Sequence, residues 1–164
     1  MATSSLGLNL YTLRESLPYL TSALGAMGLI HGFVSFRDPA FGAKSFGIDI
    51  GSTLTPKDVA YTRIHGIRNI KDGALNIALS SFLVFSSACR SSPLAADVVR
   101  KCIGVMLLIR SAVGVVDGWT VSEYAKSQGS KKDDGQSAEK SPKVAMPVQF
   151  AVFVAALGAA HLYL

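Results

Sequence analysis

Two aspartates and two arginines interrupt or border the apolar stretches of this sequence: Asp72, Asp117, Arg68 and Arg110. An aspartate beside an arginine stays ionised in a dry pocket, whereas an aspartate without such a partner is pushed toward the neutral acid. Two carboxylates in different environments can therefore act as general base and general acid. We interpret Asp72 and Asp117 as a candidate acid–base pair whose ionisation Arg68 and Arg110 tune.

Polar residues accompany these four on shared helix faces. On a helix with about 100° per residue, seven residues of 61–80 fall within about 60° of one direction. They are Tyr61, His65, Arg68, Asn69, Asp72, Asn76 and Ser80. A sparser face of a second helix holds Met106, Arg110, Gly114, Asp117 and Val121. We expect five further polar residues to orient a substrate: His31, His65, Asn69, Asn76 and Gln149.

The same charges have a structural interpretation. Arg68 and Asp72 could form an i,i+4 surface pair in water and headgroups, worth a few tenths of a kcal/mol. Arg63 and Lys71 lie outside the stripe, where they can reach headgroups. Arg110 is harder to explain in this way, because an arginine at the centre of a membrane helix costs about 2.5–3.5 kcal/mol. We expect it to face the bundle interior and find an acid.

Several kinds of site are not expected. The three histidines fall on different predicted helices without the spacing of a metal site, so no metal is predicted. The sequence contains no phosphate loop, dinucleotide fingerprint or nucleophile elbow, so no cofactor is predicted. It has no basic run interleaved with aromatics, which argues against nucleic acid as a partner. His161 is interpreted as a packed or interfacial histidine.

The elements that must position these residues are membrane helices. The chain of 164 residues is 49% hydrophobic and only 16% charged, whereas soluble domains carry about 25% charged residues. Four apolar stretches approach the length of about 20 residues that a helix needs to cross a bilayer: 17–36, 73–88, 102–121 and 145–164. The first lacks the basic start of a signal peptide. The sequence predicts a single-domain, all-α integral membrane four-helix bundle.

Capping signals set the expected helix bounds. Thr55 precedes Pro56 and an acid in the first turn, and Ser92 precedes Pro93. Pro18 and Pro147 lie near the expected starts of the first and last helices. The helices are predicted at about 17–36, 57–88, 93–121 and 145–164, with a flexible hydrophilic linker at 125–143. Small residues four apart predict close helix contacts: Gly28 and Gly32, Gly114 and Gly118, Ala151 and Ala155.

Charge in the loops predicts the orientation. Four crossings place both termini on one side of the membrane, and the loops after the first and third helices on the other. Those two loops carry more Lys and Arg than the terminal side, which predicts that they are cytosolic and the termini lumenal. The endoplasmic reticulum is the expected membrane. Cys89 and Cys102 flank the short lumenal loop and are expected to be free thiols, although a disulfide is compatible with that compartment.

The peptide "RIHGIRNIKDGALNIALSSFLVF", preceded by "FRDPAFGAKSFGI", carries a family resemblance. Its motif is Arg63, Gly66, Arg68, Asn69 and Gly73. From about residue 19 to 164 the chain resembles a family of small fungal four-helix membrane proteins known only as domain of unknown function 4267. The resemblance implies four spanning helices in one domain. Because members of such families can lie among genes for fungal specialised metabolites, it also implies a cyclase or hydrolase role, without assigning catalytic residues.

Two functions follow as expectations. The first is an integral membrane enzyme that performs cofactor-free acid–base chemistry, such as isomerisation, cyclisation or epoxide opening, on a lipophilic small molecule. The second is a non-catalytic membrane carrier, scaffold or partner subunit whose polar stripe is a structural network. Membrane lipid is an expected partner of both, and another membrane protein of the second. An open pocket would favour the enzyme, and a fully self-paired network the alternative.

Overall fold

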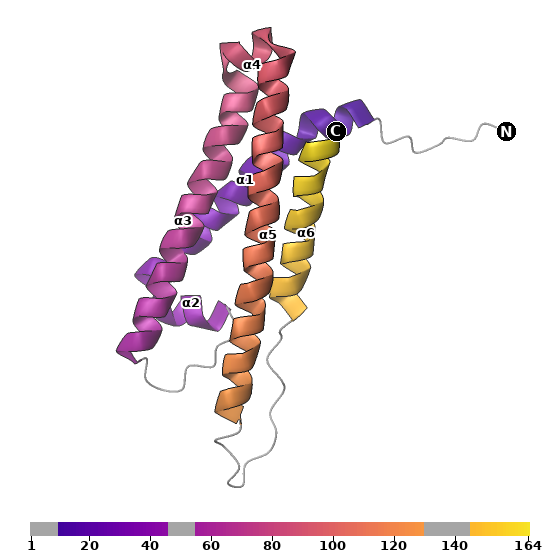
Figure 1. Ribbon diagram of the computed structural model, residues 1–164. Helices are drawn as coiled ribbons and strands as arrows, with labels where there is room; N and C mark the ends of the chain where they lie inside the picture. The colour runs from indigo at the N-terminus through magenta and orange to yellow at the C-terminus, as the bar shows by residue number, and fades with distance from the viewer. Residues whose placement is uncertain (1–9, 46–54, 130–144) are drawn as a thin grey trace, which may run out of the picture.

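The computed structural model describes residues 10–45, 55–129 and 145–164, and these residues are helical apart from short breaks. Figure 1 shows four long helices arranged side by side, with two short ones at their connections. The helices are α1 (Leu10–Arg37), α2 (Pro39–Ser45), α3 (Pro56–Phe85), α4 (Ser87–Ser91), α5 (Pro93–Gly129) and α6 (Ala145–Tyr163). The all-α prediction is therefore confirmed for this part of the chain.

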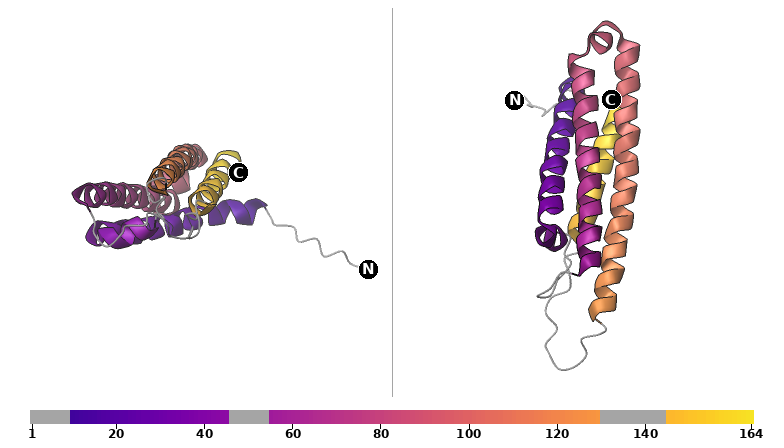
Figure 2. Two further views of the ribbon diagram at one scale, coloured as in Figure 1. Left: turned by 90° about the horizontal axis from the view of Figure 1, so that it is seen from below. Right: turned by 90° about the vertical axis from the view of Figure 1, so that its left-hand side faces the viewer.

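The long helices form two pairs. α1 packs along α3 and α5 packs along α6, whereas α3 meets α5, and α1 meets α6, over much shorter stretches. In the view from below, α1 and α3 run next to each other, and α5 and α6 lie together beside them (Figure 2, left). The start of α1 and the end of α6 lie at the same end of the bundle (Figure 1), as four alternating helices require.

Glycines bring the backbones of α1 and α3 together. A Cβ atom added to Gly73 would lie 2.5 Å from the carbonyl oxygen of Gly25, and one added to Gly32 would lie 2.7 Å from that of Gly66. The reverse contacts are equally close, since a Cβ on Gly66 would lie 2.8 Å from the Gly32 oxygen. Small residues at such contacts let helices approach closely, as the sequence predicted for Gly32.

The α5–α6 pair uses the same device once, with Gly104 and Gly158 as the reciprocal glycines. Ser111 also donates a hydrogen bond of 2.7 Å to the carbonyl oxygen of Ala151. Where the two pairs meet, apolar side chains from all four long helices and from α4 form the core. The core residues are Leu17, Leu24, Leu83, Cys89, Ile103, Leu107, Val154 and Leu157.

The first helix begins earlier than predicted, at Leu10, so Pro18 is interior to α1 and buried. An interior proline has no N–H to donate to the carbonyl four residues earlier, which here belongs to Arg14. The side chain of Arg100 takes over this role, because its Nη1 donates a 3.0 Å hydrogen bond to the Arg14 oxygen. Pro18 therefore does not mark the start of the helix. The distant Arg100 side chain bonds the Arg14 carbonyl that the proline leaves without a partner, so the proline is tolerated inside the helix.

Other boundaries also moved. The predicted second helix ends at Phe85, and Ser86 caps the short α4 by accepting from the N–H of Cys89 at 3.3 Å. α5 continues to Gly129 and so includes the first residues of the predicted linker; 130–144 lies outside the described residues. The first loop contains α2, whose first N–H groups donate to Asp38.

Two predicted helix starts are confirmed. Thr55 and Asp58 form a reciprocal capping box at the start of α3, and Ser92 accepts from the N–H of Ala95 at the start of α5. Both caps satisfy backbone N–H groups that have no partner inside the helix.

Within the described residues, Leu10–Arg37 is the helix that is long and apolar enough to cross a membrane, with a mean hydropathy of 1.3 over its best 18 residues, and Gln149–Tyr163 is a shorter apolar helix. The four-crossing arrangement remains a prediction. Cys89 is buried, Cys102 is exposed, and both are free thiols.

Candidate functional site

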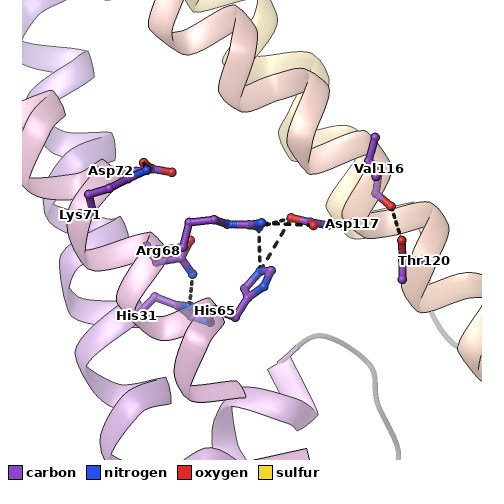
Figure 3. Close-up of polar contacts among 9 residues, drawn as sticks. His31, His65, Arg68, Lys71, Asp72, Val116, Asp117 and Thr120 are labelled. Carbon is purple, nitrogen blue, oxygen red and sulfur yellow. Dashed lines mark hydrogen bonds and ion pairs between the residues drawn. The ribbon is translucent and has the colours of Figure 1, made fainter. Parts of the chain in front are cut away.

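Arg68 connects the two helix pairs. Its guanidinium forms an ion pair with Asp117 of α5, in which Nη1 donates to Oδ1 at 3.3 Å and Nη2 to Oδ2. The Nε2 atom of His65 lies 3.3 Å from Arg68 Nη2 and 3.9 Å from Asp117 Oδ2, and the Tyr61 ring stacks on the His65 ring. Figure 3 shows Arg68 reaching across from α3 to Asp117. This cluster is a link between helices as well as a group of ionisable side chains.

A second polar group links α1, α2 and α3. The Nδ1 atom of His31 lies 3.5 Å from Asn69 Nδ2, and its Nε2 atom lies 3.0 Å from the hydroxyl of Ser45. The Phe41 ring of α2 lies 6.3 Å from the His31 ring. The expected neighbours His31 and Asn69 are therefore adjacent, but their partners hold α2 against the bundle.

Asp72 lies in a different environment from Asp117. It forms an ion pair of 3.1 Å with Lys71, and both residues line a groove of about 610 Å³ between α3 and α5. We call this space the α3–α5 groove. It is lined by Arg68, Lys71, Asp72, Leu75, Asn76, Val98, Lys101, Cys102, Val105, Met106, Ile109, Arg110 and Val113. Its volume is within the range of about 300–1,000 Å³ that is usual for small-molecule sites.

Arg110 does not find the expected acid. Among the described residues it forms no ion pair within 4 Å, because Asp117 is held by Arg68 and Asp72 by Lys71. Its side chain extends toward α1, where a Cβ on Gly28 would lie 3.4 Å from Nη2. Its Nη1 atom is buried without a hydrogen-bond partner. Arg110 thus points into the bundle, as predicted, but keeps an unbalanced positive charge.

Asn76 is fully buried at the groove, and neither its Oδ1 nor its Nδ2 atom has a hydrogen-bond partner in the described part of the chain. Ser80 lies one turn further along α3 and is buried and unpartnered in the same way. Buried polar groups normally have partners, so an unpartnered amide beside a groove indicates a place where a ligand or water binds. Gln149 is exposed on α6 and belongs to neither polar group.

The predicted site residues therefore fall into separate sets. Arg68, Asp72, Asn76 and Arg110 share the α3–α5 groove. Asp117 and His65 hold Arg68 from outside the groove lining, and His31 and Asn69 lie against α2. The two aspartates are thus not neighbours in one pocket, because the groove lining on α5 ends at Val113, about one turn before Asp117.

Three features were not anticipated from the sequence. Lys71 was expected to reach lipid headgroups, yet it pairs with Asp72 inside the groove lining. Lys101 and Cys102 also line the groove, nearer the start of α5 than Arg110. His161 is packed, which is one of the two alternatives expected for it, but its partner was not anticipated: the buried Thr21 hydroxyl lies 2.9 Å from His161 Nε2, which joins α1 to α6. His161 gave a signal because it interrupts the apolar end of the chain, whereas Thr21 lies beside Ser22 and gave none.

Within 10–45, 55–129 and 145–164, no three His, Cys, Asp or Glu side chains come together in a way that could hold a metal ion. The groove instead offers cations, a carboxylate and an amide beside apolar surface. This arrangement suits recognition of an apolar molecule with a polar group, and proton transfer to or from that group.

Comparison with curated proteins and with solved structures found no match for this chain. One family model does match, over residues 25–161, and this range includes every residue that lines the α3–α5 groove. Since the match extends over most of the chain, the protein belongs to the family described as "Domain of unknown function (DUF4267)".

Proposed function

We propose that this chain is an integral membrane protein whose α3–α5 groove binds a lipophilic small molecule, and that Asp72 performs cofactor-free acid–base chemistry on it. The observation that carries the proposal is the groove itself, with a volume of about 610 Å³, an apolar lining and a cluster of ionisable groups at one end.

The membrane setting is supported by the outer surface. Large apolar side chains are exposed on all four long helices, among them Phe33, Ile64, Ile109 and Phe153. Their polar counterparts Thr21, His65, Asn76 and Ser111 are buried. This inside-out distribution is expected where lipid replaces water around a helix bundle. The stretch 102–121 is apolar apart from Arg110 and three other polar residues.

A ligand is supported by the groups that the protein does not satisfy itself. Arg110 has no ion-pair partner and Asn76 has no hydrogen-bond partner among the described residues, and both line the groove. Ionisable residues within a membrane helix are expensive and mark functional sites by default. A polar core with only a structural role would pair its members, as the His65, Arg68 and Asp117 cluster does.

The chemistry we propose differs between the two aspartates. Asp72 lines the groove, where its carboxylate can take a proton from a bound molecule and return it elsewhere. Arg110 is placed to stabilise negative charge that develops on the molecule. Asp117 holds Arg68 and supports the site from behind. This division suits isomerisation, cyclisation or epoxide opening, in which one proton is moved without a net redox change.

A carrier or scaffold is the second candidate. The observation that favours it is the extent of self-pairing among the polar residues, since Arg68 with Asp117 and His31 with Asn69 form links between helices. Such a protein would bind the molecule without changing it.

The experiment compares small-molecule extracts of cells that make the intact protein, no protein, Asp72→Asn or Glu15→Gln at equal protein levels. Glu15→Gln makes the same carboxylate-to-amide change on α1, away from the groove lining. We expect a product that depends on the protein, is retained in Glu15→Gln and is lost in Asp72→Asn. An unchanged product in Asp72→Asn would refute the catalytic role, and extracts that never differ would favour the carrier.

A further inference from the structure

At the polar end of the groove, one cationic side chain has no ion-pair partner among the described residues. Asp72 is occupied by Lys71 at 3.1 Å, and Arg68 is occupied by Asp117. Arg110 is the remaining ionisable group of this end, and it has no ion pair among the described residues. The polar end therefore has one positive charge more than the protein neutralises.

The place of Arg110 is built into the helix packing. A Cβ added to Gly28 of α1 would lie 3.4 Å from Arg110 Nη2. The guanidinium of Arg110 therefore reaches from α5 to the surface of α1, while Arg110 also lines the groove between α3 and α5. An unbalanced arginine in such a position is costly, and an anion that binds beside it removes most of that cost.

Most of the remaining groove lining is apolar. Leucine, valine, methionine and isoleucine side chains line it between Val98 and Val113, which are about 22 Å apart along α5 at 1.5 Å per residue. Lys101, which lines the far part, is already neutralised by Asp97 at 2.8 Å. The groove is therefore a long apolar channel with its one spare charge near one end.

From this arrangement we infer that the ligand of the α3–α5 groove is a single-chain amphiphile with an anionic head, of the long-chain carboxylate class. The inference rests on the proposed function and deepens it by naming the ligand class. The carboxylate lies beside Arg110, whose fork of N–H donors matches a carboxylate. The apolar chain extends along α5 toward Cys102.

Charge and volume favour this class over a membrane phospholipid. One unbalanced cation matches one negative charge, and a groove of about 610 Å³ is of the size that encloses one small molecule. A two-chain lipid would have to leave one chain outside the groove. A neutral chain would leave Arg110 uncompensated.

Cys102 provides the measurement, because it is exposed and lines the groove, whereas Cys89 is buried. The full chain with Cys89→Ser is reconstituted in vesicles of zwitterionic phospholipid, and the rate of maleimide labelling of Cys102 is followed at neutral pH. Three probes are titrated: hexadecanoate, hexadecanol and an anionic two-chain phosphatidylglycerol. We expect hexadecanoate to protect Cys102 at about tenfold lower concentration than hexadecanol, the difference that one charged hydrogen-bonded contact provides.

Single arginine substitutions test which side chain binds the anionic head group. Arg110→Gln should remove the preference for hexadecanoate over hexadecanol, and Arg110→Lys should keep part of it. Arg63→Gln is the matched control, because Arg63 is exposed over the Phe36 ring and outside the groove lining. Protection of Arg110→Gln by hexadecanol shows that the variant has kept its groove.

The outcomes separate the two proposals. Equal protection by hexadecanoate and hexadecanol overturns the anionic head while leaving a lipophilic ligand in place. Stronger protection by phosphatidylglycerol overturns the single chain. If none of the probes changes the labelling of Cys102, both the ligand class and the binding function are refuted.

Discussion

The helices within each pair are in contact through glycines, whereas α3 and α5, which belong to different pairs, are joined by an ion pair. Within α1–α3 and α5–α6, glycines allow the backbones to touch, as Gly73 does at Gly25 and Gly104 at Gly158. Between α3 and α5 the backbones stay apart, and an ion pair from Arg68 to Asp117 crosses a space that becomes the groove. Close glycine packing therefore holds each helix pair together, and the looser interface between the pairs contains the polar groups of the groove.

This difference shows where substitutions should affect stability and where they should affect binding. A tightly packed contact has no room for one extra methyl group, because interiors are as dense as organic crystals. An interface that contains a groove tolerates changes of shape but depends on its charges. Four substitutions test the comparison.

The largest effect is expected for Gly73→Ala. The new Cβ would lie 2.5 Å from the Gly25 carbonyl oxygen, so α1 and α3 must move apart. We expect the free energy of unfolding in detergent to fall by about 2–3 kcal/mol, the usual cost of overpacking. Gly114→Ala is the matched control, because among the described residues its Cβ would meet the Ala151 Cβ alone, at 3.6 Å. Equal losses in both variants would show that backbone contact does not distinguish these glycines.

Asp117→Asn should weaken the inter-pair interface. It leaves Arg68 without its counter-ion at a site where the two side chains are 34% and 26% exposed. We expect a loss of about 1–2 kcal/mol in the free energy of unfolding, between the values for surface and buried pairs. The double variant Arg68→Gln, Asp117→Asn should lose less free energy of unfolding than Asp117→Asn alone, since neither charge is then left without its partner. A double variant that loses the sum of the two single losses would mean that the ion pair contributes nothing.

Asn76→Leu should change stability in the opposite direction. The amide is fully buried and unpartnered among the described residues, which costs stability in the ligand-free protein. We expect a gain of about 1 kcal/mol in the free energy of unfolding together with weaker protection of Cys102 by hexadecanoate. Thermal unfolding and labelling on the same samples measure both. A destabilised variant would show that the amide has a partner that holds the helices together.

The smallest effect is expected at Thr55, which touches neither interface. Thr55→Ala removes the hydroxyl that accepts from the Asp58 N–H and donates to Asp58 Oδ2 at 2.6 Å. We expect a loss of about 0.5–1 kcal/mol, typical of an exposed helix cap. The measurement is chemical unfolding at neutral pH, with groove binding unchanged.

The cap also predicts a pH dependence. Hydrogen bonds from Thr55 hold the pKa of Asp58 below its ordinary value of 3.8. A carboxyl group with a lowered pKa stabilises the fold above its ordinary pKa, and this stabilisation is lost as the pH falls below 3.8 through the folded-state pKa. Unfolding of the intact chain should therefore become easier in this acid range, and Thr55→Ala should show less of this change. An identical acid dependence in both proteins would refute the role of the cap.

Some elements could be predicted because their signals are local. The Thr55–Asp58 capping box, the Ser92 cap and the apolar stretches depend on neighbours within a few residues, and the helices follow them. The small residues on α1 also indicated close packing, although only the structure shows that Gly32 meets Gly66 while Gly28 faces Arg110.

Other features depend on distant residues. Pro18 lies inside α1 because Arg100, far along the chain, bonds the Arg14 carbonyl. The acid for each arginine could not be chosen from sequence spacing either. Asp117 lies seven residues after Arg110 on the same helix, yet it pairs with Arg68 of α3.

The sequence by itself determined that the chain is helical, which residues are apolar, and which ionisable residues share a helix face, because these properties follow from composition and a fixed helical period. The tertiary structure decided which faces meet. It placed Asp72 in the groove and Asp117 behind it, and within the described part of the chain it gave Arg110 no counter-ion. The physical reason is that glycine contacts on α1–α3 and α5–α6 fix how each helix is rotated, and that rotation determines where each side chain points.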